Sequence, residues 1–230
     1  MEKNIRFIDL GVIGYKEGWD YQEGLFKETL KIKNNNLNLD GIQKQPTLNY
    51  LIFCEHPHVY TLGKSGSENN LLINNDFLNR INATYFKTNR GGDITYHGYG
   101  QIVGYPIFDL ENFKTGVKDF VHKLEETIIK TLKEFNIFAC RFENATGVWI
   151  INPEKQSYHK ICAIGIKVSR YVTMHGFALN VNTDLTYFSH INPCGFTDKG
   201  VTSMQKELGQ EVDIDRVKNN IMKNISEVFK

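Results

Sequence analysis

Apolar residues recur at helical spacing in four stretches of the chain. Val117–Phe135 carries an apolar residue every three or four positions, which predicts an amphipathic helix. Asp213–Phe229 has the same period, and Thr202–Leu208 predicts a shorter helix. Tyr15–Lys31 also gathers large apolar residues on one side and predicts a further helix, although two internal glycines weaken the signal.

Short apolar or alternating runs lie between these helices and predict strands. The polar run Asn34–Asn38 predicts a surface loop. Because strands and helices are intermixed without the regular alternation of a doubly wound fold, we expect an α+β fold. It would be a single domain over residues 1–230, with mixed sheets flanked by helices and residues 209–230 as a C-terminal helical extension. The expected strands are Ile5–Leu10, Tyr50–Cys54, Val59–Leu62, Tyr85–Thr88, Ile94–Tyr96, Ile102–Ile107, Ile137–Cys140, Val148–Ile151, Ile161–Val168 and Val172–Val181.

The composition narrows the class of protein. Apolar residues make up 41% of the 230 residues and charged residues 23%, which is typical of a globular domain and not of a disordered chain. Lys and Arg (27) nearly balance Asp and Glu (26), and the net charge of +1 argues against a nucleic-acid-binding domain. The first residues lack the apolar core of a secretory signal, and no apolar run approaches the about 18 residues of a membrane span. We therefore expect a cytoplasmic protein that does not engage a membrane.

The four cysteines differ in their surroundings. No pair has C-x-x-C spacing and the histidines lack metal-ligand spacing, so we expect no metal site. Cys54, Cys140 and Cys162 lie in apolar, strand-like runs, where a thiol behaves as a small hydrophobe. Cys194 lies instead between a proline and a glycine, on a turn that would hold its sulfur in place. The local sequence leaves two interpretations open, a nucleophile and a turn cysteine without a chemical role.

The segment Arg90–Gly104, RGGDITYHGYGQIVG, is rich in glycine. Glycine permits a positive φ and lets the backbone approach a ligand closely, so the segment predicts a loop that wraps an extended ligand. A pair of tight turns around a hairpin would use the same glycines. The spacing of a phosphate-binding P-loop is absent.

A lysine opens the second candidate segment, Lys160–Asn180. Burial and a charged neighbour would perturb the ionisation of Lys160, whereas a solvated lysine at a strand end is the alternative. A nucleophilic thiol must be ionised, and a nearby ammonium favours the thiolate. Lys160 and Cys194 would make such a pair if the fold brings them together.

Taken together, these segments resemble the lipoyl(octanoyl) transferase family. The resemblance extends from about Ile5 to Leu208. The sequence departs from the family pattern at Tyr99, where proline is usual, and at Cys162, where alanine is common. The motifs that carry the resemblance are EHPHVYTLGK at 55–64, RGGDITYHGYGQIVGYPI at 90–107, KICAIGIKVSRYVTMHGFALNVN at 160–182 and INPCG at 191–195.

The resemblance implies an acyltransferase with a fold similar to that of the biotin and lipoate protein ligases. Cys194 would be the thioester nucleophile, and Lys160 would lower the pKa of that thiol and move its proton. The implied donor is octanoyl-acyl carrier protein, and the implied acceptors are lipoyl domains of 2-oxoacid dehydrogenase complexes and the glycine cleavage H protein. No cofactor is implied, because a thioester is already activated. The implied acyl pocket consists of Arg90, Gly91, Gly92, Asp93, Ile94, Thr95, Tyr96, His97, Ala163, Ile164, Gly165, Gly176, Phe177 and Ala178.

Three other functions would use some of the same residues. An ATP-dependent lipoate or biotin ligase would need the glycine-rich segment but no cysteine. A hydrolase would pair Cys194 with His97 or His175 and pass the acyl group to water. A binding domain would hold an acyl chain or a carrier protein without turnover.

Overall fold

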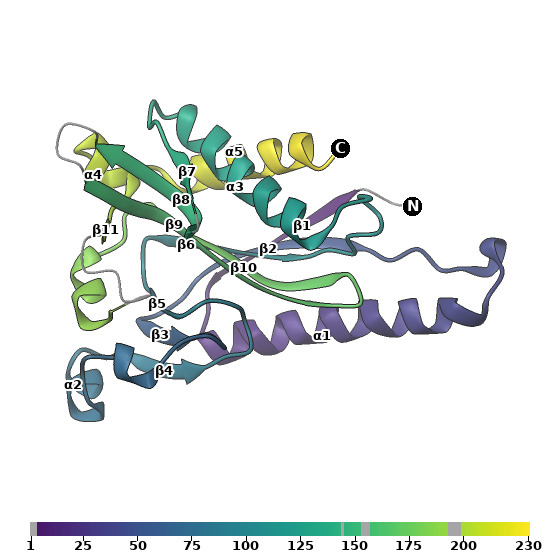
Figure 1. Cartoon of the computed structure of the whole chain (residues 1–230), viewed down its shortest axis with the longest axis horizontal. Coiled ribbons are helices and arrows are strands. Elements are labelled where there is room, and N and C mark those ends of the chain that lie inside the picture. The colour runs from purple at the N-terminus through teal and green to yellow at the C-terminus, as the bar shows by residue number, and fades with distance from the viewer. Residues whose placement is uncertain (1–3, 144, 153–156, 193–198) are drawn as a thin grey trace.

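The computed structural model describes residues 4–143, 145–152, 157–192 and 199–230. A large sheet of eight strands runs through the middle of the molecule in the order β1-β2-β6-β10-β9-β8-β7, with β11 beside β9 (Figure 1). The sheet is mixed, because β1 and β2 are parallel, as are β9 and β11, whereas the other pairs are antiparallel. Its strands are β1 (Ile5–Val12), β2 (Asn49–Glu55), β6 (Gln101–Ile107), β7 (Cys140–Phe142), β8 (Ala145–Asn152), β9 (Ser157–Ser169), β10 (Val172–Asn180) and β11 (Lys199–Val201).

A smaller sheet lies beside the first turns of helix α1 (Figure 1). It has three strands in the order β4-β3-β5, and β3 pairs in parallel with β4 and antiparallel with β5. The α+β fold with mixed sheets is therefore confirmed. The strands are β3 (Val59–Leu62), β4 (Thr84–Lys87) and β5 (Ile94–His97).

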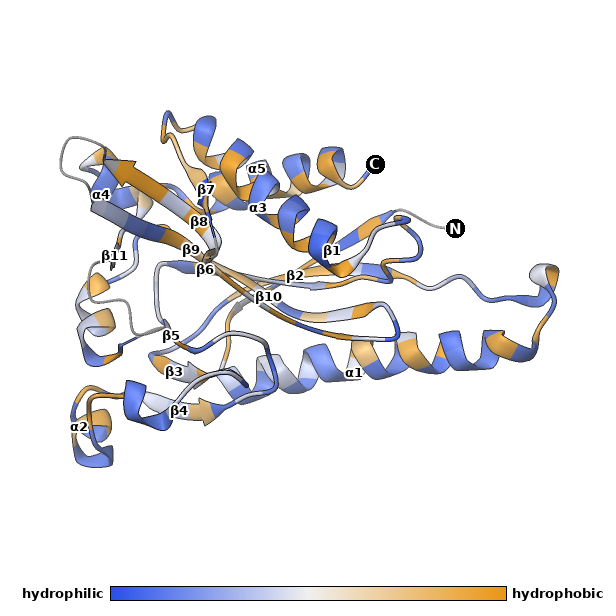
Figure 2. Ribbon diagram, in the orientation of Figure 1, coloured by the Kyte–Doolittle hydropathy of each residue, from blue (hydrophilic) through white to orange (hydrophobic). Residues whose placement is uncertain are grey.

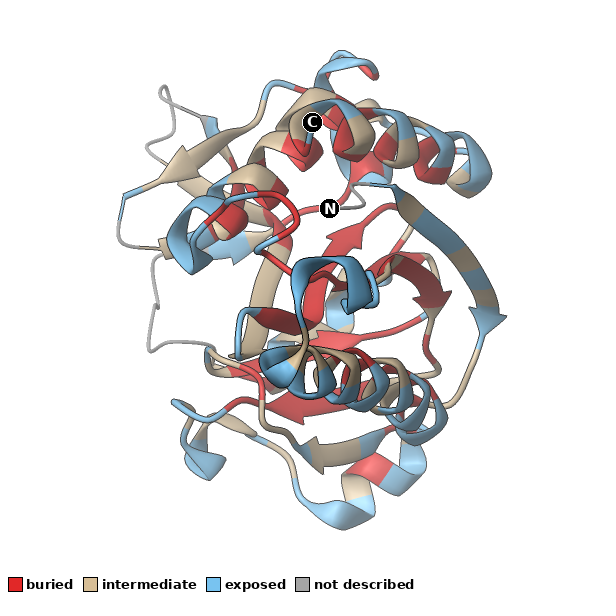
Figure 3. Ribbon diagram, turned by 90° about the vertical axis from the view of Figure 1, so that its right-hand side faces the viewer, coloured by how far each residue is buried: buried red, intermediate tan, exposed pale blue. Residues whose placement is uncertain are grey.

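Helices cover both faces of the large sheet (Figure 3). Helices α3 and α5 pack together on one face, and α1 lies on the other, next to β6 and β10. Each of these helices mixes hydrophobic and hydrophilic residues along its length, as expected where one side is buried (Figure 2). The helices are α1 (Tyr15–Asn35), α2 (Asn75–Arg80), α3 (Val117–Lys133), α4 (Met204–Leu208) and α5 (Ile214–Val228), with short 3₁₀ turns η1 (Asn36–Asn38), η2 (Gly41–Gln43), η3 (Glu68–Asn70) and η4 (Leu185–His190).

The main hydrophobic core lies between the large sheet and the α3–α5 pair. Leu124 and Ile128 of α3 and Ile221 and Ile225 of α5 are fully buried there. Each such side chain contributes about 2 kcal/mol through burial. Residues 209–230 are thus largely helical, and the apolar side of their helix contributes to this core.

Two expected elements were wrong. Asn34–Asn38 is not a loop, because α1 continues to Asn35 and ends in η1, where the Asn36 side chain bonds the backbone of Gln45. Ile137–Cys140 is not a strand, because Ile137 N–H donates to the Leu132 carbonyl in the turn that ends α3. The apolar character of Ile137 reflects its burial in the core, and strand β7 begins only at Cys140.

One glycine in α1 has a packing role. A Cβ at Gly18 would lie 3.0 Å from the His56 ring, so a larger residue would push the helix away from β2. The helix predicted over Tyr15–Lys31 is confirmed despite its glycines. None of the helices in the described ranges is both long and apolar enough to cross a membrane.

Candidate active site

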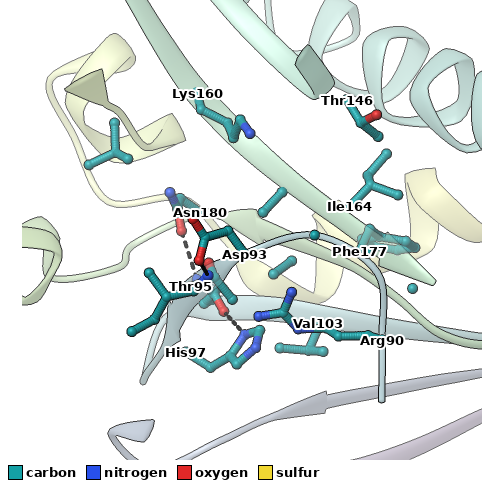
Figure 4. Close-up of a pocket in the computed structure, with 18 of the residues that line it drawn as sticks. Arg90, Asp93, Thr95, His97, Val103, Thr146, Lys160, Ile164, Phe177 and Asn180 are labelled. Carbon is teal, nitrogen blue, oxygen red and sulfur yellow. Dashed lines mark hydrogen bonds between the residues drawn. The ribbon is translucent and has the colours of Figure 1, made fainter. Parts of the chain in front are cut away.

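A cavity of about 320 Å³ lies between the two sheets. Most of the predicted pocket residues line it, although they come from three strands and a loop that are far apart in the sequence (Figure 4). The lining residues among those predicted are Arg90, Gly92, Asp93, Ile94, Thr95, His97, Lys160, Ala163, Ile164, Gly165, Gly176, Phe177 and Ala178.

Small residues on two central strands create the space. Ala163 of β9 is paired with Ala178 of β10, and Gly165 is paired with Gly176. Paired residues and residues two apart on a strand share one face of a sheet, so all four lie on the same face. Because none has a side chain larger than a methyl group, the backbone of the sheet itself forms this wall.

The glycine-rich loop closes the cavity over β9. Gly91 N–H donates to the Ile166 carbonyl at 2.8 Å. A Cβ at Gly165 would lie 2.8 Å from the Gly91 carbonyl oxygen, too close for the loop to stay in place. The backbone of the loop at Gly91 can therefore lie directly against the backbone of β9. Gly91 was predicted to line the pocket, but it is not among the residues that line the cavity.

Tyr96 was predicted to line the pocket and does not. Strand β5 alternates, so Thr95 and His97 line the cavity whereas Tyr96 points to the other side. There its ring stacks on Tyr187 at 4.9 Å, and its hydroxyl lies 2.7 Å from His58 Nδ1.

A chain of buried hydrogen bonds runs beneath one end of the cavity. Asn180 Oδ1 accepts a hydrogen bond from Gln101 Nε2 at 2.9 Å, and Gln101 Oε1 lies 2.8 Å from His97 Nδ1. Thr61 Oγ1 lies 3.3 Å from His97 Nε2 and accepts a hydrogen bond from Arg90 at 3.0 Å. Gln101 Oε1 can only accept a hydrogen bond, so His97 carries its proton on Nδ1. His97 Nε2 is then the acceptor for the Thr61 hydroxyl.

Burial keeps His97 neutral. Loss of solvation lowers its pKa to about 3, with the charges of His56 and Arg90 acting in the same direction. His97 is therefore a hydrogen-bonding group at neutral pH and not a cation.

His175 also faces the cavity, from a strained position in β10. Its φ of 60° is left-handed, which is uncommon for a residue other than glycine. Its backbone N–H donates to the Gln22 side chain at 3.1 Å, and its Nε2 lies 2.7 Å from Asn89 Oδ1. Desolvation, with Arg90 and Lys167 adding to it, lowers the pKa of His175 to about 3.

Lys160 lies at the end of the cavity away from His97 and Arg90 (Figure 4). It stands between Trp149 of β8 and Val201 of β11, its partners on the two sides of β9. Its Nζ lies 4.7 Å from the centroid of the Trp149 ring. The sequence predicted Lys160 at the start of its strand. In the structure it lies inside β9, which begins at Ser157.

Other residues that the sequence did not single out also line the cavity, among them Tyr15, Gln101, Trp149 and Asn180. Burial raises the pKa of Tyr15 to about 12, so its hydroxyl keeps its proton at neutral pH. Gln101 and Asn180 are buried polar residues that are paired across β6 and β10. Buried polar residues in such strands are a signal for a site, because each needs a hydrogen-bond partner.

Cys194 lies outside the described residues. On either side of the segment that contains it, Ile191 and Gly200 line the cavity. Cys54 and Cys162 are fully buried, and burial raises the pKa of both thiols. Cys140 is half-buried. Within the described part of the chain, no group of three or more His, Cys, Asp or Glu side chains is placed to hold a metal ion.

Comparisons with known proteins agree on one family. Residues 15–226 match the family model for the lipoyl protein ligase A/B catalytic domain. The chain is 54% identical to an octanoyltransferase from Flavobacterium johnsoniae, over 100% of this chain and 98% of the relative. It is 51% identical to an octanoyltransferase from Cytophaga hutchinsonii, over 99% of this chain and 93% of the relative.

The solved structures support the fold. A bi-partite lipoate protein ligase from Thermoplasma acidophilum superposes with a TM-score of 0.66 at 16% sequence identity. The match covers 97% of this chain and 82% of that one. The expected similarity to the lipoate ligase catalytic domain is therefore confirmed.

Proposed function

Because the chain belongs to the lipoyl protein ligase A/B catalytic-domain family, we propose that it transfers an octanoyl group from octanoyl-acyl carrier protein to a lysine of a lipoyl domain. Octanoyltransferase relatives at about half identity over nearly the whole chain make the protein an acyltransferase that acts in lipoylation. The donor, the acceptor and the covalent intermediate are our proposal.

One observation carries the proposal most directly: the cavity joins an amine to an apolar slot. Lys160 lines the same space as Ala163, Ile164, Phe177 and Ala178. An alkyl chain that leaves water for such a slot gains about 0.8 kcal/mol per CH₂. The octanoyl tail would lie along these residues with its thioester carbonyl near Lys160.

The proposed reaction has two acyl-transfer steps through Cys194. The Cys194 thiolate attacks the thioester carbonyl, the bond between the carbonyl carbon and the carrier sulfur breaks, and Lys160 gives the leaving sulfur its proton. The acceptor lysine then attacks the Cys194 thioester, Lys160 takes the proton of the attacking amine, and the Cys194 thiolate leaves. Atoms and charges balance without ATP, since the donor thioester supplies the driving force.

Two features of the described residues support this assignment. Ile191 and Gly200, which flank the segment containing Cys194, line the cavity together with Lys160. The three thiols that the structure describes are poor nucleophiles, because burial raises the pKa of Cys54, Cys140 and Cys162 and so disfavours the thiolate. Backbone N–H groups near Cys194 or in the glycine-rich loop would stabilise the oxyanion.

The acceptors we propose are lipoyl domains of 2-oxoacid dehydrogenase complexes and the glycine cleavage H protein, and the location we propose for the enzyme is the cytoplasm. These assignments rest on the family and on the requirement for a protein-borne lysine as the second substrate.

The test is an intact-mass measurement after incubation with octanoyl-acyl carrier protein. We expect an octanoyl adduct in the wild-type protein and in Cys140→Ala, and none in Cys194→Ala. Adding a lipoyl domain should discharge the adduct and add the same mass to the domain.

Each alternative function gives a different result. An adduct that persists in Cys194→Ala would contradict the assignment of the nucleophile. Acylation of the lipoyl domain from free octanoate, dependent on ATP and Mg²⁺, would indicate a ligase. Accumulation of octanoate would indicate a hydrolase, and binding without any adduct would indicate a carrier-binding domain.

A further inference from the structure

We propose that Trp149 is a positioning residue for Lys160 and that its ring face holds the ammonium before the first proton transfer and again after the second. This inference rests on the proposed role of Lys160 in acyl transfer. It assigns a function to an aromatic residue of the cavity wall that the reaction itself does not require.

The contact is made by a ring whose orientation is fixed. Trp149 is 2% exposed, and its Nε1–H donates to the Ala145 carbonyl at 2.9 Å. The Phe142 ring packs against it at 5.5 Å. With the indole held on two sides, the face toward Lys160 cannot turn away.

The alkyl stem of Lys160 is held as well. The register of β8 shifts between Val148 and Trp149, and Gly147 just before it has a φ of 122°. The Cε and Cδ atoms of Lys160 lie 3.5 and 3.6 Å from where a Cβ of Gly147 would be. The stem therefore lies against backbone, and the irregular part of β8 brings Trp149 opposite Lys160.

Helix α3 fixes this irregular part of β8. Glu125 Oε1 accepts a hydrogen bond from Gly147 N–H at 3.0 Å, and its Oε2 accepts one from Arg141 at 3.1 Å. Glu125, which is paired with Arg141, and Cys162 are thus among the titratable groups near Lys160. Burial raises the pKa of the Cys162 thiol, against a smaller opposing effect of the Lys160 charge.

A ring face distinguishes the two states of the amine. The negative face of an indole attracts an ammonium but gives a neutral amine no comparable attraction. The ammonium is therefore held over Trp149, and after the proton has passed to the leaving sulfur the neutral amine loses that hold. The position of Lys160 would follow its charge through the reaction.

The chain contains a matched control for this contact. Lys167 lies on the same strand β9, and its Nζ is 5.0 Å from the centroid of Phe26. Lys167 is not among the residues that line the cavity. Changes at this second pair reproduce the loss of a lysine–aromatic contact at two residues that are not among those lining the cavity.

The kinetic test compares two substitutions that both remove the indole N–H. Trp149→Phe keeps an aromatic face and should keep kcat within about threefold of wild type, whereas Trp149→Leu should lower kcat about tenfold, with KM for the carrier and the acceptor unchanged. Phe26→Leu should leave kcat at the wild-type value. Equal rates for Trp149→Phe and Trp149→Leu would overturn the proposal.

A spectroscopic test keeps Trp149 in place and so does not depend on how its variants fold. The sequence has two tryptophans, so Trp19→Phe leaves Trp149 as the only one. Its fluorescence should change in an alkaline titration, and Lys160→Met in that background should abolish the change while Lys167→Met does not. Identical titrations with and without Lys160 would refute the contact.

The two proposals fail separately. Full transfer activity in Lys160→Met would refute the proton-transfer role of Lys160 and with it the proposed mechanism. A loss of activity in Lys160→Met together with equal rates for the two Trp149 variants would refute the positioning role alone.

Discussion

The two ends of the cavity are built on different principles. At the His97 end, Asn180, Gln101, His97, Thr61 and Arg90 form one continuous hydrogen-bonded chain. At the other end, Lys160 lies over an aromatic face. Hydrogen bonds with fixed donors and acceptors hold groups whose protonation stays the same, whereas a ring face holds an ion that, in the proposed reaction, gives up and regains its proton. The comparison separates a rigid polar network from the residue that we propose reacts.

Removal of the amine should have the largest effect. Lys160→Met should lower kcat for octanoyl transfer by about 10²–10⁴-fold, because a positioned acid–base group contributes that much. The melting temperature should change little, since the methionine keeps an unbranched apolar stem. Lys167→Met serves as the control on the same strand and should retain wild-type activity. Similar losses in both variants would mean that β9 has been disturbed and would remove the distinction between the two ends.

A break in the hydrogen-bonded chain should affect stability more than chemistry. Gln101→Leu leaves His97 Nδ1–H and Asn180 Oδ1 buried without their partner, and we expect a loss of about 2–3 kcal/mol in the free energy of unfolding. Urea denaturation measures this loss. The same substitution at the exposed Gln43 should stay within about 0.5 kcal/mol of wild type. Comparable values at both positions would contradict the structural role of the chain.

The neutral histidines predict a smaller effect that depends on pH. The pKa of His97 is about 3 in the folded protein and near 6.5 in the unfolded chain, so the unfolded state binds the extra proton between these values. The stabilisation is complete above about pH 6.5 and is lost as the pH falls toward 3, with a slope of at most about 1.4 kcal/mol per pH unit. In urea titrations from pH 7 to 4, His97→Gln should flatten this dependence. An unchanged slope in His97→Gln would show that His97 is not held neutral.

The sequence predicted the elements of the fold well and their contacts less well. The periodicity of Val117–Phe135 and Asp213–Phe229 reflects local burial, and both became helices, α3 and α5. Tyr96 shows where the use of a motif fails: a run of neighbouring residues was assigned to one pocket, although side chains of a strand alternate between two faces.

The residues that the sequence did not single out depend on contacts between distant segments. Trp149 meets Lys160 because the register of β8 shifts between Val148 and Trp149, and that shift leaves no periodic signal in the sequence. Gln101 and Asn180 are 79 positions apart and acquire their role from strand pairing. Such features follow from topology and not from local propensity.

The wall formed by Ala163, Gly165, Gly176 and Ala178 has a consequence for how a ligand enters. Backbone and methyl groups have no side-chain rotamers that must change on binding. The shape of this wall is therefore the same before and after an acyl chain binds. Almost none of the binding free energy is then spent on ordering this side of the slot, and the entropy lost on binding falls mainly on the flexible tail of the guest.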